Sequence, residues 1–229
     1  MFKILIISTL LFILYNNSQG KVYQVKKIHK EITVTGYGTD QMWEKANILT
    51  DFTYPWKKEE IPITEFRSLW SDTHFYFLYK VKDDKIIIPQ RGLGEDDVIK
   101  SDRVEIFFKP VNENKPYYSL EVDALGRLLD SEGVFYDHVN IGWSWPEDQI
   151  DLKASHQPGS YIVEGSISMT SLKELGLYNG DGLLNAGLYR GEYFIKPNNE
   201  VGVNWISWVK PNSKNFHIPS SFGMLKLLE

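Results

Sequence analysis

The chain has 229 residues, a formal net charge of −5 and no cysteine. A mildly acidic chain without basic clusters is not typical of nucleic-acid-binding proteins, so we expect no nucleic-acid partner. Without cysteine, neither a disulfide nor a lipid-modified cysteine can form, so packing and hydrogen bonds must hold the fold. Aromatic residues make up 14% of the chain, which is typical of a sheet protein that presents rings to a ligand.

The first twenty residues have the pattern of a secretory signal peptide. Lys3 precedes a mostly apolar run over residues 4–15, and the small residues Ser18 and Gly20 suit cleavage after Gly20. The run is too short to span a bilayer comfortably, so we expect no stable membrane insertion; an uncleaved anchor is the alternative. Cleavage removes one lysine and leaves one domain over residues 21–229 with a charge of −6, in a secreted or periplasmic protein.

Strand signals dominate the remaining chain. Runs of alternating, β-branched and aromatic residues bounded by turn residues predict strands over residues 68–70, 74–82, 103–109, 117–123, 159–167 and 184–193, and two more around residues 205–208 and 223–227. Helical signals are few: a turn or two at 41–46, and capping-box spacing from Ser171 to Glu174 with Gly176 to end the helix. This pattern predicts an all-β fold, a single antiparallel β-sandwich of jelly-roll or immunoglobulin-like kind with one or two short helices.

The turn between the last two strands is predicted to hold Phe216 out toward solvent. It closes through Pro219 and Gly223 before the final apolar strand. Exposed rings beside polar groups suit ligands with one apolar face and many hydroxyls. In the preceding strand Trp205 and Trp208 point to opposite faces, so we expect one of them to pack in the core.

Charged residues share one face of two neighbouring predicted strands. In the strand 103–109, Arg103 and Glu105 lie opposite the apolar residues 104, 106 and 108, and Glu121 and Asp123 share a face of the next strand. If the strands pair, three carboxylates and a guanidinium meet on one surface. That surface is either a solvated charged face or a set of hydrogen-bonding groups for sugar hydroxyls.

These segments together resemble the family 9 carbohydrate-binding modules, which occur on xylanases and as free-standing exported proteins. The resemblance covers about residues 32–227. It rests on the order of Gly36 with Trp43, the segment 68–72, Asp83-Asp84, Asp102-Arg-Val-Glu-Ile-Phe107, the segment 159–164 and the segment 216–223. It implies a β-sandwich with a sugar slot on one side, an oligo- or polysaccharide partner of plant type such as xylan, and a glycoside hydrolase as a candidate partner enzyme.

The resemblance also implies site residues. Glu105 matches the family's sugar-binding carboxylate, Asp123 takes a polar position on the next strand, and Phe216 replaces one of two tryptophans that sandwich the sugar. The family pattern also implies that Trp208 is the tryptophan that packs in the core. Two positions depart from the family: Ile99 stands where the other tryptophan is expected, and Glu121 stands where some members have arginine. The best substitutes for the missing ring are Trp143 and Trp145, although packing is the alternative role for either.

Arg190 is a further candidate ligand residue. Its strand carries glycines at 187 and 191, which let another group approach closely. Arg190 either pairs with Glu192 or another carboxylate, or reaches the ligand; both interpretations stay open.

No cofactor is predicted to be required. Asp83, Asp84 and Asp96 offer hard oxygen ligands for a structural calcium ion, with an acidic turn that binds no ion as the alternative. The five histidines show no ligand spacing, and we expect His217 to order its own loop. Because the resembled modules do no chemistry, we predict a non-catalytic protein. The alternatives are a haem- or redox-partner-binding module, which needs an axial His or Met, and a glycoside hydrolase, which needs two carboxyl groups at a defined separation.

Overall fold

The computed structural model describes residues 20–229 apart from 93, 113–114 and 136–137, so the predicted signal sequence up to residue 19 lies outside the described residues. Most of the described chain forms strands. These are β1 (Val22–Lys27), β2 (Thr64–Trp70), β3 (His74–Lys82), β4 (Arg103–Lys109), β5 (Tyr117–Asp123), β6 (Leu128–Val134), β7 (His138–Asn140), β8 (Ile150–Gln157), β9 (Ser160–Ser168), β10 (Leu183–Ile195), β11 (Val201–Ser207) and β12 (Gly223–Leu228).

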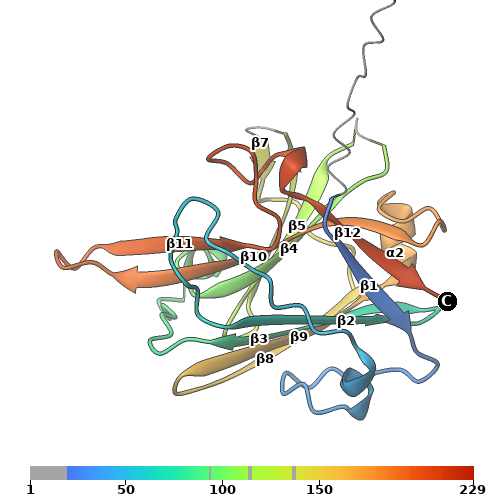
Figure 1. The fold of residues 1–229 in the computed structure, drawn as a ribbon, viewed down its shortest axis with the longest axis horizontal. Helices are drawn as coiled ribbons and strands as arrows, with labels where there is room; N and C mark the ends of the chain where they lie inside the picture. The colour runs from blue at the N-terminus through green and yellow to red at the C-terminus, as the bar shows by residue number, and fades with distance from the viewer. Residues whose placement is uncertain (1–19, 93, 113–114, 136–137) are drawn as a thin grey trace, which may run out of the picture.

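The strands form one continuous sheet that folds over itself into two layers. Its order is β7-β6-β5-β4-β10-β12-β1-β2-β3-β9-β8, and β11 pairs with β10. Figure 1 shows β4, β5 and β10 above β2, β3, β8 and β9, with β1 and β12 joining the two layers on the right and the β10–β11 hairpin projecting to the left. The predicted β-sandwich is confirmed.

One strand departs from the predicted antiparallel arrangement. β1 runs parallel to both of its neighbours, β12 and β2, whereas the other pairings between strands are antiparallel. The predicted strands 74–82, 103–109 and 117–123 match β3, β4 and β5 residue for residue. Four strands were not predicted: β1, β6, β7 and β8.

Helical segments are short, as expected. They are the 3₁₀ helices η1 (Gln41–Lys45) and η2 (Pro219–Ser221) and the α-helices α1 (Glu95–Val98) and α2 (Met169–Glu174). The cap of α2 is Ser168, whose hydroxyl accepts the Ser171 N–H at 3.0 Å, so this helix begins earlier than the spacing from Ser171 to Glu174 predicted. In the part of the chain that the structure describes, no helix is long and apolar enough to cross a membrane.

The large hydrophobic core lies between the two layers and contains the predicted inner face of β4, Val104, Ile106 and Phe108. Trp208 is also in this core and is 1% exposed, as predicted. Its ring leaves room only for glycine at position 223, because a Cβ there would come 2.6 Å from the indole. The C-terminal loop is thereby fixed to the sheet at both of its ends.

A buried carboxylate holds the N-terminal segment onto β9. Glu164 accepts hydrogen bonds from Trp43 Nε1 at 2.8 Å, from Thr35 N at 2.8 Å and from Gly36 N at 2.7 Å. Gly36 has φ +83°, and a Cβ there would meet the backbone of Ala154 at 2.9 Å, so only glycine fits. Gly36, Trp43 and Glu164, which all contribute to the family resemblance, therefore meet in one structural contact. A buried carboxylate needs hydrogen-bond partners of this kind.

Candidate functional site

The outer face of β4, β5, β10 and β11 carries the predicted site residues. We define the outer face by Arg103, Glu105, Glu121, Tyr193 and Trp205, which lie on the side of these strands away from the large core. A second cluster of rings covers part of it under the loop 209–222 and contains Phe107, Tyr117, Tyr189 and Phe216. Because of this cover, β4 is buried on both faces.

The strand register confirms that the charged residues meet. Glu105 lies directly opposite Glu121 in β5, and Arg103 lies opposite Asp123. On the other side of β4, Arg103 lies opposite Gly191 in β10. The surface predicted from the sequence therefore exists, with Arg103 at its centre.

Arg103 is held between two carboxylates and two rings. Its Nε donates to Glu105 Oε1 at 2.8 Å and lies 2.8 Å from Glu121 Oε2. The guanidinium carbon is 5.6 Å from the ring centroid of Tyr193 and 5.2 Å from that of Trp205. These are cation–π distances, so the guanidinium fills the space between the two rings.

Glycine at 191 makes this arrangement sterically possible. A Cβ at Gly191 would lie 3.2 Å from the ring of Trp205 and 3.3 Å from that of Tyr193. The outer end of the guanidinium is fixed as well, because Nη1 donates to the Ile99 carbonyl and to the Tyr193 hydroxyl, both at 2.8 Å. Ile99, which stands where the family's second tryptophan is expected, thus contributes its backbone oxygen to the site.

The carboxylates differ in how far they reach solvent. Glu105 is 1% exposed and Arg103 is 5% exposed, whereas the Glu121 side chain keeps 13% of its surface. Trp205, Tyr193 and Ile99 are half-buried. A ligand approaching the outer face therefore meets Glu121 and the two rings, with Glu105 behind them.

Burial and the nearby charge of Glu121 raise the pKa of Glu105 to about 8. Burial also raises the pKa of Glu121. Arg103 can balance only one of the two carboxylates, so near neutral pH the pair keeps a proton. In such a pair one carboxyl can donate a hydrogen bond while the other accepts.

Glu105→Gln is expected to make folding less dependent on pH. Because the folded-state pKa of Glu105 is raised, its contribution to stability is present below the ordinary carboxyl pKa and is lost as pH rises through about 8. Glutamine keeps the neutral form, so the variant should gain about 4 kcal/mol over the parent between pH about 5 and pH about 9, because the carboxyl pKa is raised from 4.5 to about 8 and each pKa unit is worth about 1.4 kcal/mol. Urea titrations across this range measure the difference. The exposed Glu60→Gln is the control, and parallel curves for Glu105→Gln and parent would contradict the shared proton.

The expectation of an exposed ring at Phe216 is wrong. Phe216 is 8% exposed and packs against Tyr189 at 4.9 Å, Trp205 at 4.8 Å and Trp56 at 6.3 Å between ring centroids. The loop folds back onto the sheet because His217 Nδ1 lies 2.6 Å from the Tyr117 hydroxyl. His217 thus orders its loop, as predicted, by attaching it to β5.

Trp143 and Trp145 do not supply the missing ring. Trp145 is buried in the large core, and its Nε1 donates to Ser171 Oγ at 3.0 Å. Trp143 packs on Tyr118 at 4.7 Å between centroids. Tyr118 faces the large core, on the opposite side of β5 from Glu121. Both tryptophans have the packing role that the sequence left open.

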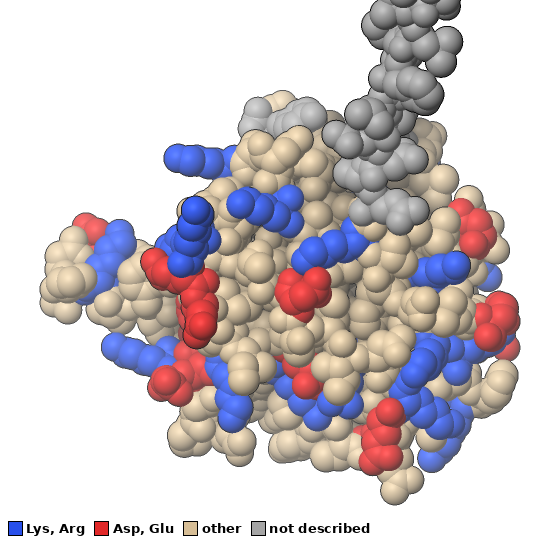
Figure 2. Space-filling view, viewed as in Figure 1, with Lys and Arg blue, Asp and Glu red and all other residues tan. Residues whose placement is uncertain are grey.

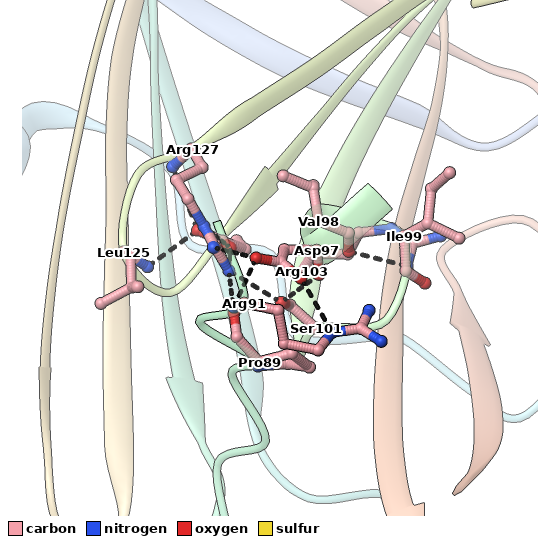
Figure 3. Close-up of polar contacts among 10 residues, drawn as sticks. Pro89, Arg91, Asp97, Val98, Ile99, Ser101, Arg103, Leu125 and Arg127 are labelled. Carbon is pink, nitrogen blue, oxygen red and sulfur yellow. Dashed lines mark hydrogen bonds and ion pairs between the residues drawn. The ribbon is translucent and has the colours of Figure 1, made fainter. Parts of the chain in front are cut away.

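Asp123 is a turn-forming residue. Its carboxylate accepts the backbone N–H groups of Leu125 and Arg127 and binds the Arg127 guanidinium at 2.7 Å. Figure 3 shows Arg127 and Arg91 around Asp97, with Arg103 beside the carbonyls of this same helical turn. Asp123 therefore supports the segment that carries Ile99, at the margin of the outer face.

Arg190 and the predicted calcium ligands lie elsewhere. Arg190 is fully buried on the inner side of β10, where Nη2 binds Asp83 at 2.8 Å and lies 3.8 Å from Glu192. In the described ranges, no three His, Asp or Glu side chains gather to hold a metal ion. The candidates Asp83, Asp84 and Asp96 form no such group, and structural calcium stays a prediction.

Tyr193 is the site residue that the sequence reasoning missed. It alternates with Tyr189 and Gly191 along β10, but only the pairing of β10 with β4 places this face beside Arg103. Asp102 fixes its backbone by accepting the Tyr193 N–H at 2.6 Å. The sequence shows that Tyr189, Gly191 and Tyr193 share one face of β10, but it does not show that β10 pairs with β4.

Comparison with known proteins identifies the family. Residues 34–229 match the model of the carbohydrate family 9 binding domain-like family. The chain belongs to this family. It is also 24% identical over 208 residues to endo-1,4-beta-xylanase A of Thermotoga maritima, a match that covers 86% of this chain and 18% of the xylanase. The chain thus corresponds to less than a fifth of that enzyme's length.

Solved structures of family 9 modules share the fold. A protein of Bacteroides uniformis assigned to carbohydrate binding superposes with a TM-score of 0.70 at 19% identity, covering 91% of this chain and 100% of that one. A family 9 module from Caldicellulosiruptor kristjanssonii in complex with glucose gives 0.60 at 18% identity, covering 91% and 96%. A family 9 module from the same organism in complex with cellotriose gives 0.59 at 18% identity, covering 90% and 93%.

Proposed function

We propose that this protein is an exported, non-catalytic carbohydrate-binding module that holds an oligosaccharide or a chain end on its outer face. One observation carries the proposal: residues distant in sequence converge there into carboxyl, guanidinium and aromatic groups, with both Glu121 and Trp205 in contact with Arg103. Rings pack on the apolar faces of sugars, and fixed polar groups bond their hydroxyls. The solved relatives in complex with glucose and cellotriose support this ligand class.

The two glutamates have different proposed roles. Glu121 reaches solvent and bonds sugar hydroxyls, while the more deeply buried Glu105 positions Arg103 through its 2.8 Å hydrogen bond. Both carboxylates lie side by side on the sheet and bind one guanidinium. Glycoside hydrolysis instead needs an acid and a base or nucleophile on either side of the scissile bond. This arrangement and the family match favour binding over the hydrolase and haem alternatives.

The wider setting is also a proposal. The signal-like sequence over residues 1–20 supports export, and the match to a segment of a xylanase supports action on plant polysaccharide beside a glycoside hydrolase. N-terminal sequencing of the mature protein from its native source tests cleavage after Gly20. A mature protein that still begins at residue 1 would exclude it.

Trp205→Ala is expected to weaken oligosaccharide binding at least about tenfold, or about 1.4 kcal/mol, because it removes a half-exposed ring of the outer face. Isothermal titration with cellotriose and xylotriose measures the change. Tyr37→Ala is the control, since Tyr37 is 63% exposed on the segment held by Glu164 in the other layer. Equal affinities for Trp205→Ala and the parent would place the sugar elsewhere.

A further inference from the structure

A second hollow lies at the mouth of the sandwich, between the β10–β11 hairpin and the end of β3. Its volume is about 600 Å³, and its lining includes Tyr54, Asp83, Glu192, Phe194 and Asn204. Glu192 and Phe194 follow Arg190 on the inner side of β10, so this cleft and the outer face lie on opposite sides of the same strand. Tyr193 belongs to the outer face and also lines the cleft, so the two sites adjoin at this residue and differ in their other contact groups.

The carboxylate of Glu192 is held in place with acceptor capacity left over. Its Oε2 accepts the Tyr54 hydroxyl at 2.6 Å and the Asn204 amide at 3.1 Å. Its Oε1 is 3.8 Å from Arg190, beyond hydrogen-bond distance. A carboxylate accepts about four hydrogen bonds, so Glu192 can accept more from a ligand without moving.

The charges around the cleft balance. Three carboxylates, those of Asp83, Asp84 and Glu192, are matched by Arg190 behind them and by two lysines at the rim, Lys82 and Lys85. Figure 2 shows acidic and basic side chains interspersed on the side where the hairpin projects. A balanced set of donors and acceptors suits a neutral ligand better than an ion.

An aromatic side chain is exposed beside these polar groups. Phe194 is 37% exposed and lines the cleft together with Tyr54. A surface ring gains free energy when a ligand covers its apolar face. The polar groups close by bond neutral hydroxyls that both donate and accept.

We propose that the cleft is a second binding site for a neutral saccharide, in which Phe194 packs on the sugar and Glu192 and Asn204 bond its hydroxyls. It adjoins the outer face at Tyr193 but contacts the sugar through other side chains. A glycan chain can therefore be held at two places on one molecule, and two sites on one polymer raise the overall affinity through effective concentration.

Amide chemical shifts, followed by NMR during titration of the full chain with cellotriose, test the proposal. We expect two groups of amides to shift with separate midpoints, one around Glu121 and Trp205 and one around Phe194 and Asn204. Phe194→Ala should weaken the second transition at least about tenfold and leave the first unchanged. Ile195→Ala is the control, since Ile195 is 41% exposed on the same strand outside the cleft lining.

The outcomes separate this site from the outer face. Trp205→Ala should weaken the first transition at least about tenfold and leave the second unchanged. Cleft amides that stay still while the outer face saturates would overturn the second site, as would a cleft transition that Phe194→Ala does not weaken. Shifts confined to the cleft would instead support the second site and contradict the proposed use of the outer face.

Discussion

Phe216→Ala is expected to lower the free energy of unfolding by about 3 kcal/mol. Phe216 is 8% exposed and lies in the second ring cluster, and removal of a buried phenylalanine side chain costs about 3–5 kcal/mol. The loop 209–222 would lose its main apolar contact with β10 and with Trp56. Urea unfolding followed by tryptophan fluorescence measures the loss.

Phe194→Ala is the matched control for this substitution. Phe194 is 37% exposed, so its removal should change the free energy of unfolding by less than about 1 kcal/mol. Equal small effects for both substitutions would mean that Phe216 is open to solvent in solution, as a free stacking ring requires.

Arg190→Met is expected to destabilise the protein by about 3–5 kcal/mol, the usual effect of removing one partner from a buried ion pair. Arg190 is fully buried, and its loss leaves Asp83 and Glu192 without their shared cation. Thermal and urea unfolding measure the change. The result should depend weakly on salt, because the pair is shielded from solvent.

The double variant Arg190→Met, Asp83→Leu separates charge from packing. Removal of both charges leaves no unpaired charge at Asp83 in the interior. The double variant should therefore regain about 2 kcal/mol of the unfolding free energy that the single variant Arg190→Met loses. Lys80→Met, at a half-buried position of β3, is the control. A double variant as unstable as the sum of its two single variants would show that Arg190 and Asp83 act independently.

Local sequence patterns predicted much of the fold. The strands β3, β4 and β5 are rich in aromatic and β-branched residues and stop at turn residues, so their bounds followed directly. β8, in contrast, has a single β-branched residue and no Phe, Tyr or Trp in its sequence Ile-Asp-Leu-Lys-Ala-Ser-His-Gln, and it is exposed or half-buried. An edge strand with little to bury carries little hydrophobic signal, and tertiary pairing decides its structure.

The site was predicted where a short stretch of sequence determined it. Arg103 and Glu105 share a face because successive residues of a strand alternate, and Glu121 joined them once the strands paired. The exposure of Phe216 could not be predicted in this way, because it depends on a loop folding back onto β5 through His217. Tyr193 was missed for a similar reason, since β10 lies beside β4 although about eighty residues separate them.

The burial of Arg190 also depended on long-range pairing. From sequence its flanking glycines suggested access for a ligand, but Arg190 lies opposite Val104 and so faces the interior. The same glycines serve the other side of the strand: Gly191 makes room for Trp205 and Tyr193, and Gly187 makes room for the Tyr189 ring. The glycines thus indicated correctly that other groups approach β10 closely, but those groups are aromatic rings on the face opposite Arg190.

A crystal structure of the full chain soaked with cellotriose tests the central claim most directly. We expect a sugar ring against Trp205 with its hydroxyls bonded to Glu121 and Arg103, and an outer face otherwise little changed. Cellotriose bound only away from this face, or no bound cellotriose at concentrations that saturate binding in solution, would contradict the proposed sugar site.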